Sequence, residues 1–125
     1  MRRVLSCLAV VAASFLFSNP ASGQTLTVTG PCPGVRTFSV TGLTPVVRVY
    51  FFRAFGTGSV VIPPGNLCAG TTLGLNNTVI VVGFIPSDAF GNATTTAFVP
   101  GWACGTVYVQ AIDGANCNTS NVVLL

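Results

Sequence analysis

The chain has 125 residues, of which half are apolar and 6% are charged, and it contains no histidine. This length leaves room for one domain, and the apolar content excludes an intrinsically disordered chain, which would be poor in such residues. Beyond residue 23 the charged side chains are three arginines and two aspartates. Nucleic-acid binding requires a concentration of Lys and Arg, so we expect no nucleic-acid partner.

Residues 1–23 show the layout of a secretory signal peptide. The positive segment Met1-Arg2-Arg3 precedes an uncharged apolar stretch (4–17), and Ala21-Ser22-Gly23 supplies small residues for cleavage. This apolar stretch is shorter than the roughly 20 residues that a membrane-spanning helix needs. We therefore predict a signal peptide at 1–23, a domain at 24–125 that begins at Gln24, no membrane span after cleavage, and a secreted or cell-surface location.

The rest of the chain consists of short runs in which apolar and polar residues alternate, with Gly, Pro, Asn and Asp between the runs. This period of two is typical of β-strands, and no stretch has the apolar spacing of an amphipathic helix. Leu26 and Val28 should share one face of the first strand, Phe38 and Val40 should point inward from the second, and Gly83 indicates a bulge. The expected strands, in chain order, are 25–29, 36–41, 46–55, 59–62, 78–85, 93–99, 106–112 and 121–125.

Strands of this length, separated by frequent turns, favour an all-β fold. We predict an immunoglobulin-like antiparallel β-sandwich of seven to eight strands, with a closed barrel as the main alternative. The run 46–55 is apolar on both faces, which is typical of a central strand that is covered by the core on one side and partly covered on the other.

Five cysteines are present, and Cys7 lies within the predicted signal peptide. The four others are Cys32, Cys68, Cys104 and Cys117, an even number that predicts two disulfides in a secreted chain. Three pairings are possible, and we prefer Cys32–Cys117 with Cys68–Cys104, because the first would join the opening strand to the closing one. A zinc site is disfavoured, because its cysteines usually come in closely spaced pairs.

Four segments of the sequence resemble a known but uncharacterised domain of secreted bacterial proteins. They are LTVTGPCPGVRTFSVTGLTP, PPGNLCAGTTLGL, FGNATTTAFVPGWACGTVYVQAID and CNTSNVV. That domain often lies at the C-terminus of larger extracellular proteins, sometimes after β-propeller-type repeats. The resemblance implies an immunoglobulin-like β-sandwich and an extracytoplasmic location, and it implies no catalytic residue.

Few residues beyond position 23 could carry out chemistry. Without His, Lys or Glu, the only candidate bases are Asp88 and Asp113, and both fall in predicted turns. A calcium loop usually offers several carboxylates, whereas each of these turns offers one. We therefore expect no enzyme activity, no catalytic residue, no cofactor and no metal.

The clearest candidate for a recognition surface is the aromatic and arginine-rich strand 46–55. If Val47, Val49, Phe51 and Phe55 face the core, the outward side chains are those of Arg48, Tyr50 and Phe52. Arginine and tyrosine often anchor protein interfaces. The alternative, which we favour for this strand, is a second layer of core that covers these side chains.

Trp102 is the residue on which a glycan would be expected to stack. Together these observations predict a non-catalytic secreted or cell-surface β-sandwich module that binds an extracellular protein or glycan. The alternative function is a self-assembling structural protein of an extracellular matrix or surface layer. In that case uncharged strands such as 78–85 would pair edge to edge and form a homo-oligomer.

Overall fold

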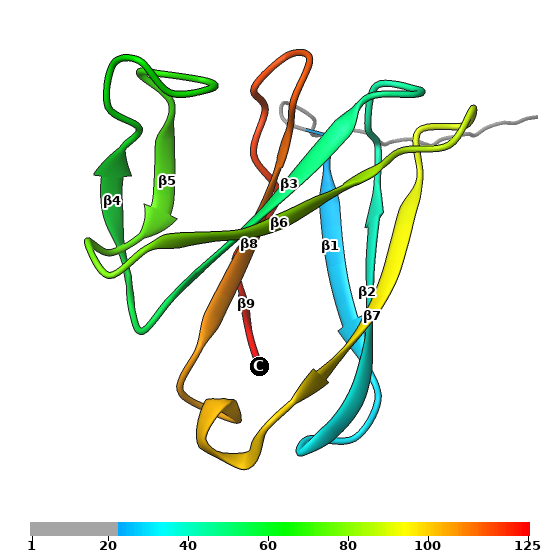
Figure 1. Ribbon diagram of the computed structural model, residues 1–125, viewed down its shortest axis with the longest axis vertical. Helices are drawn as coiled ribbons and strands as arrows, with labels where there is room; N and C mark the ends of the chain where they lie inside the picture. Colours follow the sequence, from blue (N-terminus) through cyan, green and yellow to red (C-terminus); the bar gives the residue numbers. More distant parts are fainter. Residues whose placement is uncertain (1–22) are drawn as a thin grey trace, which may run out of the picture.

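The computed structural model describes residues 23–125, which form antiparallel β-sheets and one short 3-10 helix (Figure 1). The predicted signal peptide lies outside the described residues, apart from Gly23. The elements are β1 (Thr25–Thr29), β2 (Gly34–Thr41), β3 (Arg48–Ala54), β4 (Thr57–Val61), β5 (Thr72–Leu75), β6 (Ile80–Pro86), β7 (Ala93–Val99), η2 (Gly101–Ala103), β8 (Tyr108–Asp113) and β9 (Val123–Leu124).

Within this part of the chain, nine strands form three separate sheets, with the orders β1-β2-β7, β6-β3-β8-β9 and β4-β5. The all-β prediction is confirmed, whereas the predicted number of seven to eight strands is too low. The missed strand is β5, which has four residues and follows the Gly-containing loop around Cys68. So short a run carries too little alternation to be distinguished from its loop.

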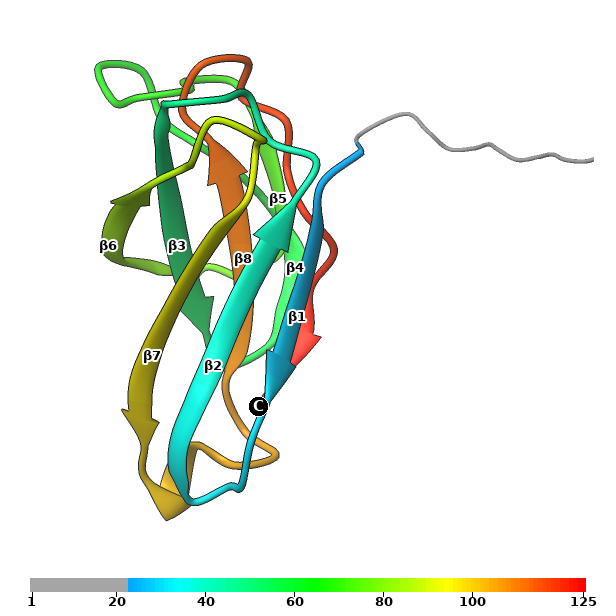
Figure 2. The same cartoon turned by 90° about the vertical axis from the view of Figure 1, so that its right-hand side faces the viewer.

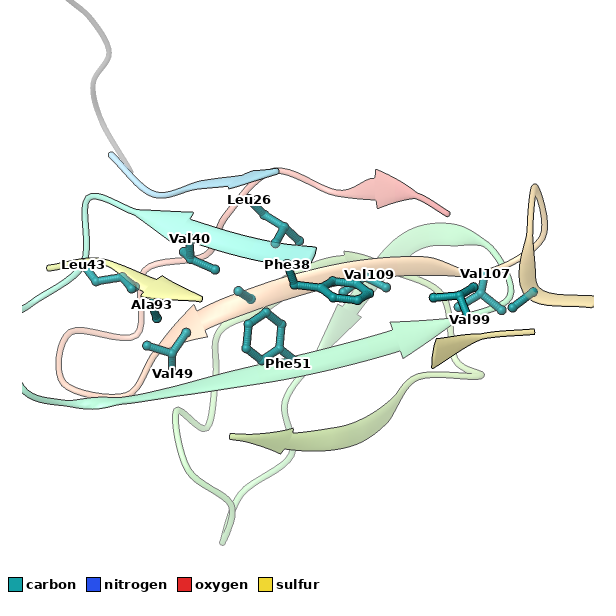
Figure 3. Packing of buried hydrophobic residues seen from close by; sticks show 12 residues of the cluster. Leu26, Phe38, Val40, Leu43, Val49, Phe51, Ala93, Val99, Val107 and Val109 are labelled. Atoms are coloured by element: carbon teal, nitrogen blue, oxygen red, sulfur yellow. The ribbon is translucent and has the colours of Figure 1, made fainter. Parts of the chain in front are cut away.

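The sheets β1-β2-β7 and β6-β3-β8-β9 pack face to face around the main core (Figure 2). Leu26 pairs with Val40, and Phe38 lies opposite Val28, so their inner faces coincide as the alternation predicts. The ring of Phe38 meets that of Phe51 on the facing sheet edge to face, with centroids 6.5 Å apart (Figure 3). Aromatic contact between the two sheets fixes their spacing at this level.

A second core lies on the other face of the four-stranded sheet, beneath the β4-β5 hairpin. Leu73 and Leu75 of β5 are buried there against Ala54 of β3 and Ile112 of β8. The Gln110 side chain of β8 adds a hydrogen bond, because its Oε1 accepts from the Gly74 amide at 2.9 Å. Strand β3 is therefore central, between β6 and β8, and it is covered on both faces.

The inward positions of β3 agree with the alternation only in part. Val49 and Phe51 are buried in the main core. Phe55 was expected inside and is 54% exposed, because β3 ends at Ala54 and the chain turns before Phe55 can face the core. Opposite Phe51, the pairing with β6 shifts from Gly83 to Val81, which leaves Val82 as the extra residue of the bulge that Gly83 indicates.

The four cysteines form two disulfides, as predicted, but the preferred pairing is wrong. The bridges are Cys32–Cys104, with Cα atoms 5.9 Å apart, and Cys68–Cys117, with Cα atoms 5.5 Å apart. The strand directions decide this outcome. The β1-β2 turn lies at the same end of the molecule as η2, whereas the β4-β5 and β8-β9 loops lie together at the opposite end (Figure 1).

Candidate binding groove

The predicted recognition residues of β3 do not form one surface. Arg48 is exposed and its Cζ lies 4.7 Å from the centre of the Phe84 ring, and Tyr50 packs against the same ring with centroids 5.5 Å apart. Phe52, in contrast, packs against the second core under the β4-β5 hairpin. The Phe52 side chain is therefore covered by a second layer of core, which is the alternative that the sequence left open, and it contributes to packing.

Trp102 belongs to a different cluster, at the far end of β3. The Arg53 guanidinium lies 6.0 Å from the centre of the indole ring, and the Phe55 ring lies 6.3 Å from it. Trp102 is 58% exposed, so much of its surface is open to a ligand. The sequence pattern included Arg53 and Phe55 in the recognition candidate 46–55, with Phe55 expected in the core, but it did not connect either residue to Trp102.

Between β6 and β7 the two large sheets leave an open groove of about 490 Å³. These strands are the neighbouring edges of the two sheets, and they diverge from the loop that connects them (Figures 1 and 2). The groove is lined by residues from β3 (Phe51, Arg53), β6 (Ile80, Val81, Val82, Gly83, Phe84, Ile85), β7 (Thr95, Thr96, Ala97, Phe98, Val99), and by Phe38, Pro100, Trp102, Ala103, Val107, Val109 and Leu125.

The groove is open because small residues stand where large ones would fill it. On β7, Thr95 and Ala97 pair with Phe38 and Arg36 of β2, and Phe38 points inward, so both β7 side chains face the space between the sheets. On the opposite wall, Gly83 has no side chain. Single substitutions at such positions could close the gap, which makes Ala97 a useful site for experiments.

The groove wall is mainly apolar, and among residues 23–125 Arg53 is the only charged residue that lines it. Ile80 and Val82 are 48% and 61% exposed beside this space. The exposed side chains of Val81, Phe84 and Phe98 belong to the faces of the two sheets that point away from the main core, because these residues pair with Phe52, Tyr50 and Val35. Large contiguous apolar patches on a protein surface commonly mark interaction sites. The amino-acid sequence does not reveal this site, and its only local signal is the strongly β-prone, uncharged segment at 78–85.

A smaller space of about 360 Å³ lies between the β4-β5 hairpin and the four-stranded sheet. Tyr50, Phe52, Val60, Leu67 and Val81 are among its lining residues. No charged residue lines it, and it adjoins the second core. We regard this space as the margin of that core.

Both aspartates serve turns. Asp88 Oδ1 accepts from the amides of Phe90 at 2.8 Å and Asn92 at 2.9 Å, which fixes the β6-β7 loop. Asp113 is fully buried, and its Oδ2 accepts from the Thr44 amide at 2.7 Å while Oδ1 accepts from the Ala115 amide at 2.8 Å. Their bonding is that of turn-forming aspartates, as expected.

Hydrogen bonding determines the charge state of Asp113. Burial acts to raise its pKa, but hydrogen bonds from Thr44 and from the backbone of Ala115 and Asn116 outweigh burial and hold the pKa below its ordinary value. Asp113 therefore remains a carboxylate at neutral pH. It ties the end of β8 to the loop before β3.

Neither aspartate lines the groove, and the four cysteines of the described chain are all in disulfides. Residues 23–125 contain no group of three or more His, Cys, Asp or Glu side chains that could hold a metal ion. In the same residues, no helix is both long and apolar enough to span a membrane.

No protein-family model, curated protein or solved structure matches this chain. The resemblance to a secreted bacterial domain therefore remains a prediction, and the groove with its surrounding residues is the feature that bears on function.

Proposed function

We propose that the chain is a non-catalytic, extracytoplasmic binding module, and that the groove between β6 and β7 binds a protein partner. The observation that carries this proposal is the size and apolar character of the groove, which is open to solvent in the described chain. Binding sites are typically concave and mostly apolar, with few polar groups that fix orientation. The two disulfides are compatible with an extracytoplasmic location.

The strand order supports an immunoglobulin-like sandwich. In the constant-type arrangement one sheet has the order A-B-E-D and the other contains C, F and G. Here β1-β2-β7 corresponds to A-B-E and β3-β8-β9 to C-F-G. No described strand corresponds to D, which would lie beside β7, and β6 lies beside β3 as an additional strand does in variable-type domains. The groove therefore lies beside the position that strand D occupies in constant-type immunoglobulin domains.

Site-specific photocrosslinking tests the proposed function. A photoreactive phenylalanine derivative is placed at Ala97, inside the groove, or at Thr94, which is exposed on the outer face of the same strand. Each protein is mixed with the culture fluid and washed surfaces of the producing cells, and adducts are identified by mass spectrometry. We expect a discrete protein adduct from position 97 that position 94 does not give. Equal adducts from both positions, or none from 97, would contradict protein binding in the groove.

Glycan binding is a second candidate, and the exposed indole of Trp102 favours it. Sugar rings stack on exposed aromatic faces, and the neighbouring Arg53 could bind a sugar carboxylate. Because Trp102 is the only tryptophan, its fluorescence reports on this site alone. Titration with neutral and uronic-acid oligosaccharides should change the emission if a glycan binds. Unchanged emission across the panel would exclude stacking of those sugars on the indole.

A further inference from the structure

The fold protects most of its strand edges. On the side away from the groove, the Asn121 side chain covers the edge of β1: Oδ1 accepts from the Leu26 amide at 2.8 Å, and Nδ2 donates to the Leu26 carbonyl at 3.1 Å. The β6 edge is interrupted by the bulge at Val82 and ends at Pro86. Bulges and prolines are devices that prevent unwanted edge pairing. The other edges belong to the short strands β4, β5 and β9.

The edge of β7 has none of these devices. Its seven residues contain no proline and no charged side chain, and their pairing with β2 is regular throughout. Among the described residues, no backbone group other than those of β2 bonds to this strand. Alternate residues of an antiparallel strand direct their N–H and C=O groups away from the partner, so β7 offers a row of free donors and acceptors. Such a row is complementary to another polypeptide backbone.

The groove beside this edge would receive the side chains of a strand added there. Alternate side chains of such a strand point to one face, where the small Thr95 and Ala97 leave room above Phe38 and Phe51. Apolar side chains fit that surface. The backbone edge and the apolar groove together define a ligand that is extended and has apolar residues at every second position.

Charge distinguishes a foreign strand from a second copy of this chain. Arg53 lines the groove near Trp102, with its guanidinium 6.0 Å from the centre of the indole ring. The matching ligand therefore carries a carboxylate at this end. In residues 23–125 the side-chain carboxylates are those of Asp88 and Asp113, which are already bonded within turns. Of these two, only Asp88 is exposed, and in a second copy it would lie in the β6-β7 loop and not in an extended strand.

We propose that β7 accepts an extended segment of a different protein as an added antiparallel strand, with alternating apolar residues and an acidic residue near Arg53. This inference rests on the proposed function and specifies the partner's chemistry. It corresponds to recognition by strand addition, in which backbone hydrogen bonds provide affinity and alternate side chains provide specificity.

The test begins with a library of random seven-residue peptides, a length that matches β7. Peptides are selected on the wild-type protein and counter-selected on Ala97→Glu, which puts a long acidic side chain into the groove. We expect enriched sequences with apolar residues at alternate positions and one Asp or Glu. The best peptide is synthesised and titrated while Trp102 emission is followed. Ala97→Glu should weaken binding by about tenfold or more, and the control Thr94→Glu should change it less than about twofold.

Chemical variants of that peptide test whether its backbone amides bond to β7 and whether its acidic residue contacts Arg53. N-methylation of one alternate set of amides should abolish binding, whereas N-methylation of the other set should leave it nearly unchanged, because only one set faces β7. Replacing the acidic residue by its amide should weaken binding to the wild type by about fivefold and leave binding to Arg53→Gln unaffected. Equal effects of the two N-methylated sets would overturn strand addition.

The outcomes separate the two proposals. A crosslinked partner at position 97 without any enriched peptide would retain the proposed function and overturn strand addition. Self-association of the wild type in sedimentation, abolished by Ala97→Glu, would identify a second copy as the occupant and overturn the inference. Enriched peptides with the expected N-methylation pattern would support strand addition, whereas the absence of both an adduct at position 97 and enriched peptides would overturn both proposals.

Discussion

At the scale of single residues, the buried carboxylate of Asp113 has the largest expected effect on stability. It accepts three hydrogen bonds, from the backbone amides of Thr44, Ala115 and Asn116. Asp113→Asn replaces one accepting oxygen by an NH2 group that faces a donor, so we expect a loss of about 2 kcal/mol in the free energy of unfolding. Asp88→Asn is the control, because its accepting Oδ1 can be kept. Urea denaturation at pH 7 measures both, and equal losses would contradict this account.

The pH dependence of stability follows from the lowered pKa of Asp113. Because the folded pKa lies below the unfolded value of about 3.9, the unfolded chain binds more protons between the two values, and stability rises with pH there. The contribution is complete above the unfolded pKa and is lost as the pH falls through the folded one. Thermal unfolding from pH 7 down to 2 should show this loss in the wild type. An identical acid-induced loss in Asp113→Asn would show that another group causes it.

At Val46, in contrast to Asp113, a substitution should stabilise the protein, because the Val46 backbone is strained. It has φ of 54°, in the left-handed region that β-branched residues rarely adopt, and its side chain is exposed. Asparagine tolerates this region better, so Val46→Asn should raise the free energy of unfolding by about 1 kcal/mol. Val35→Asn, at an exposed valine of β2, should give no gain. A loss of stability in Val46→Asn would show that the side chain has another role.

At the scale of secondary-structure elements, Asn121 joins β1 to the segment before β9. Asn121→Ala removes two hydrogen bonds to Leu26 and should cost about 1–2 kcal/mol. Asn121→Asp keeps the acceptor for the Leu26 amide and loses only the donor, so its cost should be smaller. Hydrogen exchange at the Leu26 amide should accelerate in the alanine variant. Unchanged exchange at this amide would mean that the side chain does not protect the edge.

At the scale of the whole molecule, the two disulfides stabilise different parts. Cys68–Cys117 ties the hairpin loop to the β8-β9 loop, and Cys32–Cys104 joins the β1-β2 turn to the segment after η2 at one end of the main core. Replacing either pair by alanine should cost about 2–4 kcal/mol.

Hydrogen exchange followed by mass spectrometry shows where each loss occurs. Without Cys68–Cys117, we expect exchange to rise in β4 and β5 while β2 and β7 stay protected. Without Cys32–Cys104, protection should fall in both large sheets. The same pattern of exchange in both variants would contradict the division into two cores.

Much of the fold could be predicted from the sequence because its signals are local. The alternation in 25–29 places Leu26 and Val28 on one face, and glycine next to β-branched residues indicates the bulge in β6. An even cysteine count after residue 23 predicts two disulfides without naming their partners. Which recognition candidates are covered could not be decided from the sequence, because facing outward from a strand does not reveal whether another element covers that face, as the second core covers Phe52.

The amino-acid sequence by itself determined an all-β chain, most strand positions, the inward faces of β1 and β2, and two disulfides. These properties depend on the period of two along each strand and on residue counts, which need no knowledge of distant neighbours. The tertiary structure alone decided the disulfide partners, the second core, the cluster at Trp102 and the groove between β6 and β7. Each of these depends on which strands lie side by side, and that order is set by contacts between residues far apart in the chain.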